Sequence, residues 1–302
     1  MADTAASFPV HYRERYQEKI DTIPQAISDI LSTYSHIPKE EQVAHVLRLR
    51  DRAWKRFPYP CLGDLCFLEL RPSIHPAYKD HVLAPLKKPS ADGEPEPLFL
   101  DMSSCFGQDV RKLAHDGALV HRLWASDIES ELIDIGFQMF NDADKMPRDH
   151  FLCPGNLLTN SPDDQLKVLD GKVTILHASS VFHLFSLEEQ RKIAHRCLRL
   201  LRKSPDIPTL IIGCQVGNKT ARYAPSDDSA QLYGHRYRHS EQSWREMWTG
   251  VCGSAEWKDK VKVLDVKTTE GEGETRPLTI IEASKKEKEI TWLMFEIRIT
   301  FA

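Results

Sequence analysis

The chain has 302 residues, a formal charge of −4 and a pI of about 6.4. Hydrophobic residues make up 41% and charged residues 28%, which excludes a wholly disordered or fibrous chain. This charge balance gives no general attraction to nucleic acid or anionic lipid. No run approaches the roughly 18 apolar residues of a membrane span, and the N-terminus lacks a secretory pattern, so we expect a cytoplasmic protein.

The first part of the chain is predicted to be helical. Apolar residues recur at helical spacing over 24–34 and again over 40–57. The segment 87–97, KKPSADGEPEP, is rich in proline, glycine and charge, which predicts an exposed linker. We therefore expect an N-terminal helical appendage over 1–97 and a separate core over 98–302.

Apolar runs alternate with helical stretches after the linker. A repeated strand, helix, strand pattern predicts an α/β fold with an open parallel sheet. The last two runs follow each other without a crossover helix, so we expect an antiparallel hairpin at the sheet edge. The predicted strands are 98–102, 123–128, 173–179, 209–215, 261–268 and 290–301.

Seven cysteines are scattered along the chain without a CxxC pair. Their odd number and the lack of an export signal favour reduced thiols, many of them buried. Cys61 and Cys66 lie near each other, but no second pair stands at zinc-ligand spacing. We therefore expect no metal site.

Two predicted strands end in acids. Asp101 is followed by a turn of small residues and a helix that begins near Gln108. Open α/β sheets bind ligands at the carboxyl ends of their strands. Asp127 ends the next strand, where it could accept hydrogen bonds from the ribose hydroxyls of a nucleoside or cap the following helix; both alternatives remain open. No GxGxxG occurs, which argues against a dinucleotide site.

Motifs from most of the chain resemble a known family. They include PYPCLG before the linker, CFGQDVRKLAHDGA and GFQMFNDADKM in the core, and SSVFHLFSLEEQ, IIGCQVGN and YRHSEQSW later. With these motifs the chain resembles class I S-adenosylmethionine-dependent methyltransferases, and more narrowly the fungal enzymes of meroterpenoid and polyketide pathways. Several of those enzymes methylate a carboxyl group. The resemblance implies a Rossmann-like mixed sheet of seven strands, the last antiparallel, with an N-terminal helical lid.

The resemblance also implies which residues bind S-adenosylmethionine. They fall into four pairs, placed in turn under the methionine moiety, at the ribose, beside the adenine and at the mouth near the sulfonium. In this sequence the pairs are Asp101 with Gly107, Asp127 with Ile128, Asn156 with Leu157, and His177 with Ala178.

Two positions depart from the family pattern. The family has glycine where this chain has Ser103, and a glycine there lets the backbone approach the cofactor closely. Such enzymes often carry an acid where this chain has Asn156, which can still accept a hydrogen bond through its carbonyl oxygen. Both departures bear on cofactor affinity.

His183, just beyond the strand 173–179, is the candidate catalytic residue. A carboxylate acceptor is already anionic at neutral pH and needs positioning more than a base. A phenol acceptor would gain from a general base, for which His183 is the candidate. The alternative role for His183 is a structural hydrogen bond between loop and helix.

Candidate substrate-binding residues come from two segments. In GHRYRHSEQSWREMW, Arg236, Arg238 and His239 could receive a carboxylate, and Trp244 or Trp248 could cover an apolar ring system. The alternative for this segment is a helix start capped by Ser240, with both tryptophans in the core. In the N-terminal part, the candidates are Arg50 and Trp54, which share a helix face.

Three functions compete at this stage. The first is an O-methyltransferase that acts on an apolar acid or phenol, with a carboxyl group as the preferred acceptor. The second is an isomerase or cyclase that keeps the fold without methyl transfer, and the third is a non-catalytic subunit. We expect no nucleic-acid or membrane partner, and a homodimer is left open.

Overall fold

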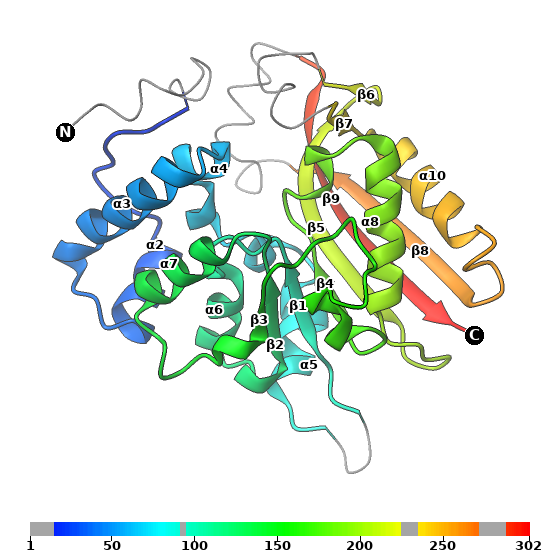
Figure 1. Cartoon of the computed structure of the whole chain (residues 1–302), viewed down its shortest axis with the longest axis horizontal. Helices are drawn as coiled ribbons and strands as arrows, with labels where there is room; N and C mark the ends of the chain where they lie inside the picture. The colour runs from blue at the N-terminus through cyan, green and yellow to red at the C-terminus, as the bar shows by residue number, and fades with distance from the viewer. Residues whose placement is uncertain (1–14, 91–94, 225–234, 272–287) are drawn as a thin grey trace.

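A seven-stranded sheet forms the centre of the computed structural model, which describes residues 15–90, 95–224, 235–271 and 288–302 (Figure 1). The strand order is β3-β2-β1-β4-β5-β9-β8. The strands are β1 (Phe99–Met102), β2 (Leu123–Ser126), β3 (Phe151–Leu152), β4 (Ile175–His177), β5 (Thr209–Asn218), β8 (Val261–Glu270) and β9 (Ile290–Phe301).

The direction of the strands confirms the expected mixed sheet. Strands β1 to β5 are parallel, and β9 runs antiparallel to both β5 and β8. The last two strands form the expected antiparallel pair at the edge of the sheet, where β8 is the edge strand and β9 lies between β5 and β8. The apolar sequence of β9 reflects this position, because β9 is mostly buried whereas the edge strand β8 is mostly exposed.

Three short strands were not predicted from the sequence. Strand β3 has two residues, too few for an alternating pattern to show. Strands β6 (Arg222–Tyr223) and β7 (Tyr237–Arg238) form a separate antiparallel pair. They lie in segments with no apolar run.

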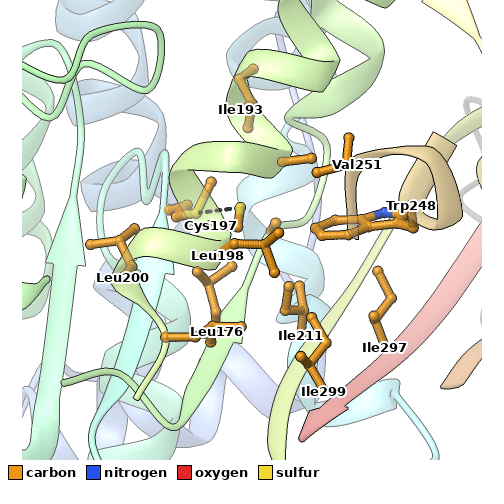
Figure 2. Packing of buried hydrophobic residues seen from close by; sticks show 14 of the residues in the cluster. Leu176, Ile193, Cys197, Leu198, Leu200, Ile211, Trp248, Val251, Ile297 and Ile299 are labelled. Atoms are coloured by element: carbon orange, nitrogen blue, oxygen red, sulfur yellow. Dashed lines mark hydrogen bonds between the residues drawn. The ribbon is translucent and has the colours of Figure 1, made fainter. Parts of the chain in front are cut away.

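Helices α8 (Leu187–Leu200) and α10 (Glu241–Cys252) cover one face of the sheet (Figure 1). Figure 2 shows Leu198 of α8 and Trp248 of α10 against Ile211 and Ile297 of the strands. Both helices begin with a capping box, which confirms the predicted cap at Ser240.

The N-terminal part packs against α7 (Ser130–Phe140) and also against the sheet, including β9. Residues of its helices share an apolar cluster with Phe106 and with Ile135 and Met139 of α7. Further along, Leu86 joins Phe99 and Leu113 in another cluster. The helices are α2 (Gln25–Asp29), continued by η2 (Ile30–Tyr34), α3 (Lys39–Arg56), α4 (Pro60–Gly63), η3 (Cys66–Glu69), η4 (Arg71–Ile74), η5 (Tyr78–Leu83) and α5 (Ala84–Lys87), which confirms the helices expected over 24–34 and 40–57.

The remaining helices connect the strands. They are α6 (Gln108–His115), η6 (Val120–Arg122), α7 (Ser130–Phe140), η7 (Arg148–His150), η8 (Gln165–Leu169) and η9 (Phe182–Leu184). In the part of the chain that the structure describes, no helix is both long and apolar enough for a membrane crossing. Residues 91–94 of the predicted linker lie outside the described ranges.

Candidate active site

The order of the sheet reverses between β1 and β4, which are hydrogen-bonded neighbours. Chain connections leave these two strands in opposite directions, so a crevice opens at their carboxyl ends, and open α/β sheets bind ligands there. Asp101 of β1 lies opposite His177 of β4 in the strand register. The residues that follow these two strands therefore define the candidate site.

The loop after β1 turns sharply at alternate residues. Ser103, Cys105 and Gly107 all have left-handed backbone, with φ of 58°, 55° and 65°. Only glycine adopts this conformation without a penalty, which is about 1–2 kcal/mol for other residues. Backbone hydrogen bonds hold the turn, including one of 2.9 Å from the Ser104 N–H to the Ser126 carbonyl. The left-handed conformation of Cys105 was not predicted from the sequence.

Helices α6 and α7 hold the same loop in place. Arg111 of α6 donates to the carbonyl oxygens of Phe106 at 2.8 Å and Gly107 at 3.2 Å. Helix α7 approaches closely at Gly136, where an added Cβ would lie 2.2 Å from the Phe106 oxygen. The loop is therefore held by side chains and packing that do not depend on a glycine at position 103.

Replacing Ser103 by glycine should stabilise the protein. The change removes the energetic penalty of a left-handed conformation at a non-glycine residue. It also adds a cost, because glycine loses more backbone entropy on folding, and the net gain in stability is about 0.5–1 kcal/mol. Urea denaturation measures this gain, and titration with S-adenosylhomocysteine should give equal or tighter binding. A loss of stability would show that the hydroxyl group makes a contact that outweighs the backbone strain.

Asp127 anchors the loop to the next helix. Its carboxylate accepts the Cys105 N–H at 2.8 Å and the Glu129 N–H at 3.1 Å, just before α7 begins at Ser130. Burial raises the pKa of Asp127 to about 6, and the backbone N–H groups oppose this shift. Asp127 is therefore not the N-cap of α7, which is Glu129, but it binds the backbone just before the helix. With three backbone N–H groups bonded to it, the carboxylate keeps acceptor capacity that a ribose hydroxyl could use.

Apolar side chains beside Asp127 are open to solvent. Ile128 is 49% exposed and Leu158 is 39% exposed. Leu157, assigned to the adenine from the sequence, is instead buried in the core, so Leu158 presents the apolar surface. Asn156 is exposed, and its Oδ1 accepts the Leu158 N–H at 2.9 Å.

A series of hydrogen bonds connects β1 and β4, the neighbouring strands between which the order of the sheet reverses. Asp101 Oδ1 lies 2.7 Å from His177 Nδ1, and His177 Nε2 lies 2.6 Å from the Ser179 hydroxyl. Ser179 in turn lies 3.3 Å from the Cys214 thiol on β5. Asp101, His177 and Ala178 are buried, whereas Ser179 is half-buried, so Ser179 rather than Ala178 faces the crevice.

Burial shifts the pKa values of the acid and the imidazole in this series of hydrogen bonds. It raises the pKa of Asp101 well above its usual range and lowers the pKa of His177 to about 4. Asp109, in the first turn of α6, is a further buried acid, whose pKa is raised to about 7 by burial and then by Asp101. A carboxylate oxygen of Asp101, one of Asp109 and a ring nitrogen of His177 all lie within 4.8 Å of one another. Sequence spacing alone gave no signal for Asp109.

His183 stands among positive charges. The pKa of its ring is lowered to about 3 by burial and then by Arg236, Arg238, Arg71 and Arg15. Its Nδ1 has no hydrogen-bond partner among the described residues. An imidazole with so low a pKa is a weak base, so the structure gives no support to His183 as the base for a phenol.

The side chains that follow β7 are too deeply buried for direct contact with a substrate. His239 is 1% exposed and its Nδ1 lies 2.8 Å from the Ser243 hydroxyl. Trp244 and Trp248 are both fully buried, and the Trp244 ring packs edge-on to Phe182. The expectation that one tryptophan contacts substrate is not supported, because spacing four residues apart puts both rings on the buried helix face.

The two N-terminal candidates also have structural roles. Arg50 is fully buried, donates to Asp51 at 2.7 Å and to the Gln17 carbonyl at 2.8 Å, and lies over the Tyr16 ring. Trp54 is 4% exposed within the N-terminal apolar cluster. Their surroundings leave no open surface for a substrate, so we place neither residue in the site.

Known proteins match this chain over most of its length. Residues 15–68 match the meroterpenoid methyltransferase N-terminal domain. O-methyltransferase phiE, from a fungal species, is 33% identical over 79% of this chain and 75% of its own. The Asnovolin E/Chermesin D methyltransferase nvfJ of Aspergillus novofumigatus is also 33% identical, over 77% of this chain and 78% of its own.

The chain belongs to the S-adenosylmethionine-dependent methyltransferases of fungal secondary metabolism. A solved structure shares the fold: the putative sarcosine dimethylglycine methyltransferase of Galdieria sulphuraria covers 86% of this chain and 98% of its own, with a TM-score of 0.50 and 12% identity. The seven-stranded mixed sheet with an antiparallel last strand agrees with the class I methyltransferase fold.

The residues around the crevice fit S-adenosylmethionine. Asp101 has a buried carboxyl oxygen, Oδ2, without a partner among the described residues, and an ammonium group placed there would oppose the raised pKa and favour the carboxylate. Asp127 has spare acceptor capacity for a ribose, and Ile128 and Leu158 offer apolar surface for an adenine. When bound, this cofactor supplies an electrophilic methyl group. Gly107 and the other left-handed residues would place the loop backbone against the methionine part of the cofactor.

Proposed function

We propose that this methyltransferase converts the carboxyl group of an apolar acid to its methyl ester. The acceptor would be a meroterpenoid or polyketide intermediate, a substrate class suggested by the relatives and not fixed by any single contact. The nvfJ relative is described as acting on asnovolin E and chermesin D. The N-terminal part would act as a lid, because Arg71 comes from it and lies over the Trp292 ring of β9 beyond the end of β4.

The positive surroundings of His183 carry this proposal. Four guanidinium groups act on its pKa from three separate parts of the chain. Two of them, Arg15 and Arg71, are each paired with a carboxylate, of Asp64 and Glu69 respectively. Arg238 lies in β7 and is half-buried, where screening by solvent is reduced. An anionic acceptor is stabilised in such a field, whereas a neutral phenol gains much less from it. A carboxylate also needs no base, consistent with the low basicity of His183.

The rate of methyl transfer at saturation should stay flat between about pH 6 and 9. A carboxylic acid with a pKa near 4 is fully ionised across this range. His183, with a pKa of about 3, stays neutral throughout, so His183→Ala should lower the rate without changing the profile. Because Asp109 has a pKa of about 7 beside the cofactor site, cofactor saturation is checked at each pH.

The opposite profile would contradict the carboxylate acceptor. A rate that rises steeply across this range, and loses its rise in His183→Ala, would identify an acceptor that must lose a proton to His183. Cofactor binding without transfer to any acid would instead favour an isomerase or cyclase on the same fold.

A further inference from the structure

Arg71 has a feature that the residues considered so far do not explain. It begins η4 in the N-terminal part and is only 8% exposed. One side of its guanidinium pairs with Glu69. Its Nη1, also buried, has no close hydrogen-bond partner among the described residues, and the Cys214 thiol, with which the guanidinium also interacts, is only a weak acceptor. A buried charged donor without a partner destabilises the folded state, so it commonly marks a place where a ligand or water binds.

A second unsatisfied donor lies next to the first. The Arg71 guanidinium stands 4.3 Å from the centre of the Trp292 ring, a cation–π contact that fixes its position. The Trp292 indole Nε1 is buried as well and finds no partner among the described residues. Two N–H donors from touching groups are thus available together. Neither guanidinium nor indole can accept a hydrogen bond, so their ligand must be an acceptor.

The position of these donors places them at the crevice. Trp292 on β9 lies opposite Val216 on β5, beyond the level at which β4 ends beside Ile212. Trp292 shares an apolar cluster with Cys214, whose thiol lies 3.3 Å from the Ser179 hydroxyl at the crevice. Arg71 lies over the Trp292 ring. Both donors therefore border the candidate active site at the carboxyl ends of β1 and β4.

We propose that Arg71 and Trp292 form a carboxylate-binding site at this crevice. A carboxylate offers two oxygens and a full negative charge, which suits a guanidinium N–H and an indole N–H that are held in contact. Two carboxylates can reach such a site: the acid group of the methyl acceptor and the carboxylate of the cofactor's methionine part. The acceptor version rests on the proposed function, whereas the cofactor version does not.

Calorimetric titrations of Arg71→Gln test this site and separate the two sources. S-adenosylhomocysteine is compared with 5′-methylthioadenosine, which lacks the amino-acid part. Dodecanoate, an apolar acid, is compared with its uncharged methyl ester. Arg71→Gln should weaken binding of at least one of the two carboxylates about tenfold or more and leave its carboxylate-free analogue within twofold. Arg48→Gln, an exposed arginine of the same N-terminal part, should change none of the four.

Trp292→Phe keeps the ring under the guanidinium and removes only the indole N–H. It should weaken the same carboxylate by about threefold to tenfold, and it tests the site even if Arg71→Gln does not fold. A loss confined to S-adenosylhomocysteine assigns the site to the cofactor, and a loss confined to dodecanoate assigns it to the acceptor. Unchanged affinity for both carboxylates in the folded variants, including no dodecanoate binding at all, would overturn the proposal. Since these readouts are binding affinities, they are independent of whether a methyl ester is formed.

Discussion

Replacing Asp142 by alanine should lower the free energy of unfolding by about 3–5 kcal/mol, because it leaves a buried guanidinium unpaired. Asp142 and Arg111 are both fully buried, and the carboxylate accepts from Arg111 Nε at 2.8 Å and Nη2 at 3.0 Å. Asp142 also accepts the Tyr34 hydroxyl at 2.9 Å. One carboxylate therefore ties α6 and the N-terminal part to the end of α7.

The same change should reach the active site, because Arg111 also holds the loop after β1 through the Phe106 and Gly107 carbonyls. Binding of S-adenosylhomocysteine should weaken in the folded fraction of Asp142→Ala. Tyr34→Phe is the matched control, since it removes one hydrogen bond and should cost only about 1 kcal/mol in urea denaturation. A cost for Asp142→Ala no greater than that of Tyr34→Phe would show that Arg111 finds another partner or hydration.

Replacing Asp127 by alanine should weaken S-adenosylhomocysteine binding by about 1.5–3 kcal/mol, roughly 10- to 150-fold. The change removes the acceptor for the ribose hydroxyls. It also frees the Cys105 N–H, so that the left-handed loop loses an anchor. Calorimetric titration measures the effect directly.

Two further variants separate these contributions. Asp127→Asn keeps a carbonyl acceptor and should lie between the parent and Asp127→Ala. Asp134→Ala removes an acid from the same region whose side chain is 54% exposed, and it should leave the affinity unchanged. Parental affinity in Asp127→Ala would restrict Asp127 to its structural role before α7.

The sequence predicted the main strands well because most of them are buried. Runs such as 209–215 and 290–301 are apolar enough to stand out without alternation, and the structure extends or trims them by a few residues. The mixed sheet of seven strands with an antiparallel last strand was implied by the family resemblance. The position of β9 inside the sheet depends on pairing between distant segments, which local patterns do not encode.

The site was only partly predictable, for a physical reason. Asp101 and His177 were each found at a strand end, but only the pairing of β1 with β4 shows that they bond to each other. Asp109 and Arg71 gave no local signal, because an isolated acid or arginine in sequence is usually a solvated surface group. Burial without a full set of partners is what distinguishes them, and that property appears only in three dimensions.

The most direct test of the proposed function is the alkali stability of the transferred methyl group. The purified protein is incubated with methyl-labelled S-adenosylmethionine and a panel of apolar carboxylic acids that also carry phenol groups, and the products are extracted and treated with mild alkali. Methyl ester formation predicts that the label enters the extract and is then released as volatile methanol, since alkali cleaves esters but not aryl ethers. Label that enters the extract and stays there after alkali would contradict a carboxyl acceptor and identify the phenol oxygen instead.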